Sequence, residues 1–336
     1  MICACIAAGR TGDALALGLV CSVLYSAEGE GEAVLAHAQI RLERFVNEQH
    51  VGIAEGREWA KAAQRLLDEP GAQAFRPAQD RADHLLRELR VEEFAHLSRF
   101  LPQGFEQRMR FFAQHLQQYV QQVSPLQTLQ RTPPKNAPSP ANSILGAIEQ
   151  AATRLEQHGL AASQSIRLEK VTMARRIVRW LHQSASQATK QLGNQLGNQS
   201  AASKQGVAQI LCWQSDEGAF VDWARFRLVG GEELPEVSQA YAQLRSLVGA
   251  RCHQLGQQFA LALPEWNRQA LATAHSQVNP ANPLNPAAGA LEEQRLVPLE
   301  AVLERVVAPL AAQQAVLLLV LDGLSTSIFR ELFNRM

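Results

Sequence analysis

The residues that point most directly to chemistry lie together near the carboxyl end of the chain. Residues 315–321 (AVLLLVL) are continuously apolar and are followed by Asp322 and Gly323. This composition is typical of a buried parallel strand, because helices cover both of its faces. A carboxylate at the end of such a strand points into the crevice where open α/β sheets bind ligands. Asp322 is therefore a candidate ligand of a divalent metal ion, and the alternative is a turn aspartate that only ends the strand.

Two hydroxyl side chains, Ser325 and Thr326, follow Asp322 closely and are candidate nucleophiles. The apolar spacing over residues 328–333 predicts a helix directly after them. Serine and threonine are preferred at helix starts, where they accept hydrogen bonds from free backbone N–H groups. We therefore favour the interpretation that Ser325 and Thr326 cap this helix, and we assign no catalytic residue.

Other sequence motifs of enzymes are absent. The nine histidines form no HxH or HExxH pair, and the chain contains neither GxxxxGK[ST] nor GxGxxG. This argues against a zinc hydrolase within the helical region and against a nucleotide-binding motor. The five cysteines are odd in number and form no CxxC pair, which indicates free thiols rather than a disulfide framework or a zinc finger.

The composition indicates a folded protein without an overall charge bias. The chain has 336 residues, 46% of them hydrophobic, and its 32 basic and 32 acidic residues give a formal net charge of zero. This length allows about two domains. A balanced charge removes the general argument for nucleic-acid binding, although a local basic patch can still bind.

An apolar run near the amino end resembles a signal peptide only superficially. Residues 14–25 (ALALGLVCSVLY) are shorter than the ~20 residues that span a bilayer. Asp13 stands where a signal peptide has basic residues, so we predict that it is the N-cap of a buried helix. We expect a cytoplasmic protein without a membrane span.

One predicted helix, residues 164–182, has a basic face. Its apolar positions form one stripe, whereas Arg175, Arg176 and Arg179 lie largely away from that stripe. The basic face can bind a nucleic-acid backbone or can be a solvated face. We favour the solvated face, because the chain as a whole is neutral.

Helical patterns separated by two proline-rich linkers predict the domain organisation. We expect a mainly α fold of helical bundle-like domains, followed by one strand–helix unit of an incomplete α/β domain. We also expect the sheet to continue beyond Met336, because a strand that is apolar on both faces needs neighbours. The predicted parts are an N-terminal helical domain (1–131), a Pro-rich linker (132–142), a second helical domain (143–278), an Asn-Pro-rich linker (279–290) and the first helix and strand–helix unit of the α/β domain (291–336).

The carboxyl-terminal block from Val297 to Met336, with its VPL helix and VLDG-S motif, resembles the start of a known domain. It is similar to the PglZ domain of the alkaline phosphatase superfamily, found in BREX phage-defence systems. Residues 12–25 and 220–237 also resemble the region that precedes this domain in type 2 BREX PglZ proteins. The resemblance covers most of the chain, but only the start of the alkaline-phosphatase-like domain.

The resemblance implies a metal-dependent phosphatase or phosphodiesterase. Asp322 would be the first metal-ligand aspartate of a two-metal site, with zinc as the expected ion. The nucleophile and the other ligands would lie on later strands, so we expect this chain to bind no metal and to have no phosphatase activity alone. Turnover of a phosphodiester that Asp322→Ala abolishes would contradict this.

The resemblance also implies partners. These are other BREX components, which the helical region would contact, and a phosphate-bearing or nucleic-acid substrate of the full-length protein. The alternative is a non-catalytic helical scaffold or protein-interaction module.

Overall fold

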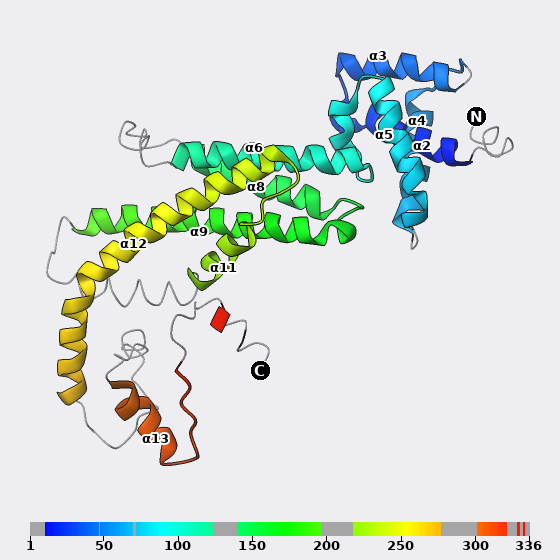
Figure 1. Ribbon diagram of the computed structural model, residues 1–336. Helices are drawn as coiled ribbons and strands as arrows, with labels where there is room; N and C mark the ends of the chain where they lie inside the picture. Colours follow the sequence, from blue (N-terminus) through cyan, green and yellow to red (C-terminus); the bar gives the residue numbers. More distant parts are fainter. Residues whose placement is uncertain are drawn as a thin grey trace. The chain divides into compact units, whose positions relative to one another are not determined.

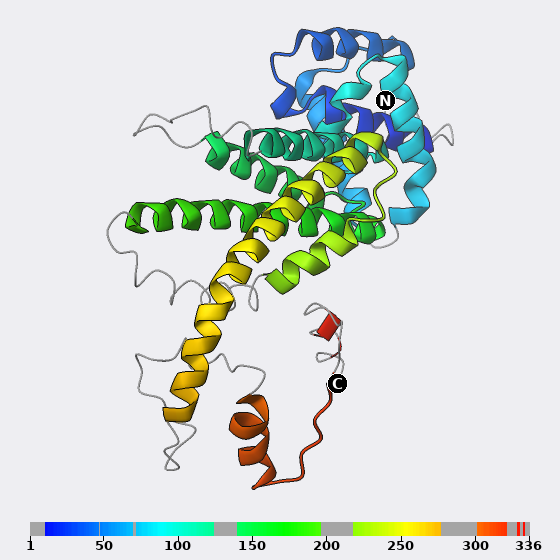
Figure 2. The same cartoon turned by 60° about the vertical axis from the view of Figure 1, so that its left-hand side comes forward.

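The computed structural model in Figures 1 and 2 is mainly helical in its described part. It describes residues 11–46, 48–69, 72–123, 140–195, 218–276, 301–320, 328–329 and 332. These residues contain no strand, and none of their helices is long and apolar enough to cross a membrane. The chain forms two compact units, which we call unit 1 (Met1–Arg175 and Gly230–Gln243) and unit 2 (Arg176–Val229 and Leu244–Met336). The mainly α fold is confirmed.

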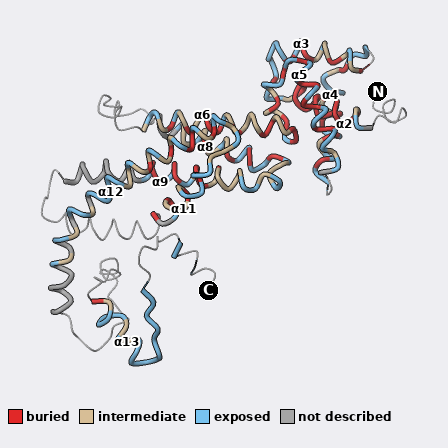
Figure 3. The backbone as a smooth tube through the Cα atoms, in the orientation of Figure 1, coloured by how far each residue is buried: buried red, intermediate tan, exposed pale blue. Residues whose placement is uncertain are grey.

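The first part of unit 1 is a helical cluster built around a buried helix. Its helices are α2 (Thr11–Leu24), α3 (Ala33–Leu42), α4 (Ile53–Asp68) and α5 (Arg76–Glu88). Helix α2 is apolar on every side and packs against α4 and α5, so the buried positions gather there (Figure 3). The buried helix predicted near residues 14–25 is therefore confirmed. The prediction for Asp13 was wrong, because α2 begins at Thr11 and Asp13 lies in its first turn, where the helix dipole also favours a carboxylate.

Polar side chains inside this cluster are satisfied by backbone groups of distant segments. Trp59 Nε1 donates to Ala14 O, Tyr25 Oη to Val51 O and Gln79 Nε2 to Phe100 O, each at 2.9 Å. Burying a polar group without a partner costs about 1–3 kcal/mol, so these bonds fix the register of the packed elements as well as their proximity. The cluster is thus held by directional contacts in addition to apolar packing.

A second group of helices in unit 1 begins at Pro102. These are α6 (Pro102–Val123), α8 (Pro140–Glu156) and the first turns of α9 (Ser165–Gln195), and α6 packs against α8. Helix α6 begins at Pro102, a residue that suits the first turn of a helix because its φ is fixed and its missing N–H needs no partner there. Asp83 of α5 accepts the backbone N–H of Gln103 at 3.0 Å and thereby caps α6 from another helix.

A close approach between α6 and the turn before it depends on Gly104. A Cβ atom added to Gly104 would lie 2.5 Å from the carbonyl oxygen of Ala95. We expect Gly104→Ala to lower the free energy of unfolding by about 1–3 kcal/mol, because a backbone atom must move. Gly146→Ala in α8 is the matched control, since nothing lies within 4 Å of its Cβ position and alanine is expected to stabilise a helix by about 0.5–1 kcal/mol. Equal midpoints of urea unfolding for the two variants would contradict this.

The remaining helices are α11 (Ala219–Arg227), α12 (Pro235–Ser276) and α13 (Ala308–Ala311). The apolar pattern of residues 219–229 is ambiguous between helix and strand, and the structure shows a helix there, α11. In α12, Pro264 lies inside the helix and removes one backbone donor. Figure 1 shows a bend in the second half of this helix.

The predicted linkers are only partly described. The linker predicted at 132–142 overlaps the start of helix α8 at Pro140. Its other residues and the whole linker 279–290 lie outside the described residues. The domain division that these linkers define stays a prediction.

The segment predicted as a strand is extended and exposed. Residues 315–320 lie in neither helix nor strand, and Leu317 and Val320 are 91% and 78% exposed. A parallel strand forms only beside another strand, and the described part of the chain offers none. Within these residues the strand is therefore not formed, and the alkaline-phosphatase-like strand–helix unit stays a prediction.

Candidate functional site

The metal site predicted from the sequence lies outside the described residues. This holds for Asp322 and Gly323 and for the two hydroxyl residues Ser325 and Thr326. Within the described ranges, no group of three His, Cys, Asp or Glu side chains is placed to hold a metal ion. The metal site at Asp322 therefore stays a prediction.

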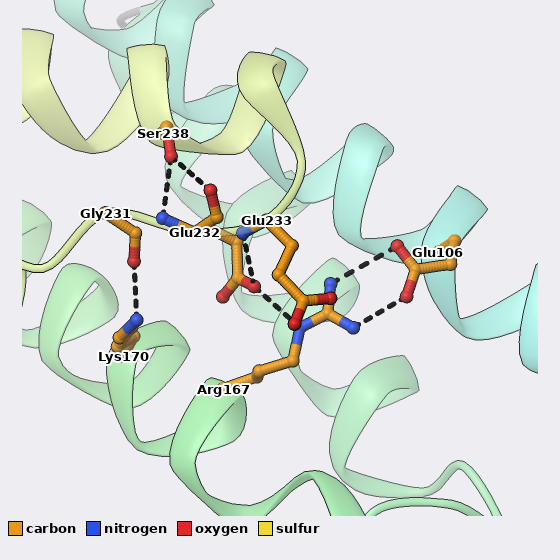
Figure 4. Close-up of polar contacts among 7 residues, drawn as sticks. All are labelled: Glu106, Arg167, Lys170, Gly231, Glu232, Glu233 and Ser238. Atoms are coloured by element: carbon orange, nitrogen blue, oxygen red, sulfur yellow. Dashed lines mark hydrogen bonds and ion pairs between the residues drawn. The ribbon is translucent and has the colours of Figure 1, made fainter.

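A group of charged side chains in unit 1 surrounds Arg167 (Figure 4). Its guanidinium contacts both carboxylate oxygens of Glu106 on α6, with Nη1–Oε1 at 2.6 Å and Nη2–Oε2 at 3.3 Å. The Nε atom lies 2.8 Å from Glu232 Oε1, in the turn before α12. The side chains of Arg167 and Glu232 are only 12% and 2% exposed. We call Glu106, Arg167 and Glu232 the Arg167 junction.

The turn that carries Glu232 is held by its own hydrogen bonds. Gly231 has a φ of +64°, a left-handed conformation that suits glycine. Lys170 Nζ donates to the Gly231 carbonyl. Ser238 Oγ accepts the N–H of Glu232 and donates to the Glu232 carbonyl, both at 2.6 Å. The turn therefore presents the Glu232 carboxylate to Arg167 in a fixed position (Figure 4).

The electrostatics of the junction favour the ionised pair. Burial lowers the pKa of Arg167, but the hydrogen bond and charge of Glu106, together with the charge of Glu232, outweigh burial and raise it. The guanidinium also lies over the ring of Phe105, 5.2 Å from its centroid. An arginine stays protonated at every ordinary pH and cannot act as a proton donor. The ion pairs of the Arg167 junction therefore fasten α6, α9 and the turn before α12 to one another.

The basic face predicted on residues 164–182 is divided between two environments. Arg175 lies near Glu149 at 3.7 Å and Glu156 at 3.1 Å, with a side chain only 19% exposed. In unit 2, the guanidinium carbon of Arg176 lies 4.9 Å from the centroid of the Phe220 ring. The prediction of one solvated arginine face was therefore wrong for Arg175, because carboxylates on α8 neutralise it. The apolar stripe of this helix is buried as predicted, at Val171, Ala174, Val178 and Leu181.

One histidine and one cysteine, His158 and Cys21, are buried in the described core and serve packing. His158 is 3% exposed, and its Nδ1 accepts the N–H of Leu160 at 3.2 Å. Burial is the main reason that the pKa of His158 falls to about 3, so the ring is neutral in the folded protein. Burial raises the pKa of the Cys21 thiol to about 12, which leaves that thiol unreactive.

The comparison with known protein families matches the helical cluster at the start of the chain. Residues 1–100 match the family model of the BREX system PglZ second domain. The match ends beside Leu101, the last residue of the buried cluster that begins at Leu15. The resemblance to PglZ is thus confirmed for this range, which includes residues 12–25. For residues 220–237 and 297–336 it stays a prediction. No curated protein and no solved structure matches the chain.

The Arg167 junction was missed by sequence analysis. Arg167 and Lys170 stand out only as members of a basic helix, and Glu232 as one of two glutamates after a Gly-Gly pair. The available signal was that Gly-Gly pair, which indicates a tight turn, inside the 220–237 segment. No pattern within one sequence connects this turn to a residue 65 positions earlier.

Proposed function

We propose that the chain acts in bacterial phage defence as part of a PglZ protein of a BREX system. The observation that carries the proposal is the match of residues 1–100 to the PglZ second domain, which coincides with one continuous buried cluster. A sequence match that coincides with one continuous buried cluster supports the transfer of a role better than a match to scattered helices. The cytoplasm is the expected location, where such a system meets phage DNA.

Within this function, the helical region serves assembly with other BREX components. In support, several buried polar side chains of unit 1 hold its segments together, as with Trp59, Tyr25 and Arg167. A rigid helical frame of this kind presents a stable outer surface to a partner. The finer assignment of a metal-dependent phosphatase or phosphodiesterase rests on the resemblance at Val297–Met336 and on Asp322.

The test of the hydrolase assignment is protection against phage. We expect Asp322→Ala, introduced into the gene in its native system, to abolish protection, because the first metal ligand is removed. The readout is the efficiency of plating of a phage that the native system restricts. Ser325→Ala is the matched control and should retain protection, since we assign Ser325 to a helix cap.

A non-catalytic scaffold is the competing function, and the same experiment separates it. If Asp322→Ala protects as well as the native protein, whereas deletion of residues 1–123 abolishes protection, the scaffold explains the function and the hydrolase assignment is wrong. Co-purification of the other components with the Asp322→Ala protein shows in the same cells that assembly is intact.

A further inference from the structure

A small basic pocket lies in unit 1 where α6 and α8 pack together. It has a volume of about 140 Å³ and is lined chiefly by His96, Arg108, Phe111, His115, Gln150 and Arg154. A water molecule occupies about 30 Å³ in the liquid, so the pocket has room for several waters or one small ligand. Its polar lining contains two guanidinium and two imidazole groups and no carboxylate.

Arg108 is held in this pocket by neutral groups. Its Nε donates to His96 O at 2.9 Å, its Nη1 to Arg154 O at 2.6 Å and its Nη2 to Ser98 O at 3.2 Å. Three carbonyls fix the plane of the guanidinium, but they do not neutralise it. A guanidinium has five N–H donors, so two remain for a ligand. No ion pair joins Arg108 to a carboxylate within the part of the chain that the structure describes.

The two histidines are oriented with one ring nitrogen already in use. His96 Nδ1 lies 2.9 Å from Glu93 O and must donate to that carbonyl. His115 Nδ1 lies 3.4 Å from Gln118 Oε1. In both rings the second nitrogen, Nε2, stays available to another group. The edge of the His96 ring also meets Phe111, with 4.9 Å between centroids, which holds the imidazole in place.

The charges in and around the pocket leave an excess of positive potential. Burial and the charge of Arg154 lower the pKa of Arg108 to about 10. Burial, with smaller contributions from Arg108 and Arg154, lowers the pKa of His96. The acidic group that opposes these effects is Glu28, which pairs with Arg154 at 3.4 Å and is 62% exposed. One exposed carboxylate thus faces two guanidinium groups.

We infer that this pocket binds a small oxyanion, namely a phosphate group. A guanidinium with a fixed plane and free N–H donors matches the oxygen atoms of phosphate, and a charge-assisted hydrogen bond is about twice as strong as a neutral one. Gln150 on α8 and His115 on α6 add further hydrogen-bonding groups on opposite helices. The phosphate displaces Glu28 as the partner of Arg154. This assignment is independent of Asp322 and of the proposed function.

Binding is tested by calorimetric titration of the full chain with inorganic phosphate and, in a second arm, with AMP. We expect Arg154→Gln to weaken phosphate binding about tenfold, which corresponds to the loss of one charge-assisted hydrogen bond. Glu28→Gln is expected to tighten binding several-fold, because the competing carboxylate is removed. Tighter binding of AMP than of phosphate identifies a phosphorylated ligand larger than phosphate, and equal binding identifies the phosphate group alone.

Two control variants separate the pocket from general charge effects. Arg65→Gln and Glu69→Gln change the net charge by the same amounts as Arg154→Gln and Glu28→Gln, but on the exposed surface at the end of α4. Both control variants should bind phosphate like the parent chain. If Arg154→Gln fails to fold, His115→Gln is the second pocket variant, and it is also expected to weaken phosphate binding. Absence of phosphate binding by the parent at millimolar concentration overturns the inference, and so do equal affinities of Arg154→Gln and Arg65→Gln.

Discussion

Replacing Arg167 by alanine is expected to lower the free energy of unfolding by about 3–5 kcal/mol, the usual cost of breaking a buried ion pair at one partner. The cost arises from the carboxylate that stays buried after the substitution. Glu232 is only 2% exposed, and without the guanidinium its carboxylate would be buried with no opposite charge beside it. Glu106 is 30% exposed and can turn towards water, so the main cost comes from Glu232.

The loss is measured by urea unfolding of the full chain, followed by the circular dichroism of its helices. Arg76→Ala is the matched control, since Arg76 pairs with Asp80 at 3.2 Å on the exposed surface of α5. An exposed pair of this kind contributes less than about 1 kcal/mol. The double variant Arg167→Met/Glu232→Gln should recover much of the stability, because no charge is left buried. If Arg167→Ala costs no more than Arg76→Ala, the junction does not fasten the turn before α12.

The periodicity of apolar residues was sufficient to predict which residues are buried, where burial depends on the pattern within one helix. The stripe of residues 164–182 and the apolar run of residues 14–25 both predict buried positions, and both are buried. In each case the information is local, because burial follows from the spacing of apolar residues within one helix. Helix starts are predictable for a similar reason, as with Pro102, whose fixed φ and missing donor suit the first turn.

Long-range polar contacts could not be predicted, since their partners are far apart in the sequence. The sequence favours a solvated face for Arg175, because its own helix places it away from the apolar stripe and the chain as a whole is neutral. Glu149 and Glu156 on α8 then cover that side. The predicted strand is a related case, because its stability depends on neighbouring strands and its own apolar run cannot supply them. The metal site at Asp322 stays a prediction for the same reason.

Acidification is expected to destabilise the native chain through His158. The pKa of this buried ring falls from its ordinary value of 6.5 to about 3, mainly through burial and also through the charges of Arg108 and Arg99. Between these two values the unfolded chain binds one more proton than the folded chain. The stability from His158 is therefore complete above pH 6.5 and is lost as the pH falls towards 3, at about 1.4 kcal/mol for each pH unit.

The matched comparison is between His158→Asn and the native chain. Asparagine keeps an acceptor for the N–H of Leu160 but cannot be protonated. From pH 7 to pH 5 the native chain should therefore lose about 2 kcal/mol relative to this variant, as measured by urea unfolding at each pH. If the free energies of unfolding of the two proteins change in parallel with pH, His158 binds its proton equally well in the folded and the unfolded chain, and the prediction is wrong.

A second variant, Asp83→Asn, is expected to show the opposite pH dependence of stability relative to the native chain. Burial raises the pKa of Asp83 from 3.8 to about 6, so the folded state holds an extra proton in this window and Asp83 penalises the fold as the pH rises through it. Asp83→Asn removes that penalty, so it should be more stable than the native chain at pH 7, with an advantage that disappears towards pH 4. In the native chain, the effects of His158 and Asp83 on the pH dependence of stability oppose each other. Comparison of the two variants separates these effects. A general effect of acid on surface charges would move both variants in the same direction, whereas buried groups of opposite charge type must move them apart.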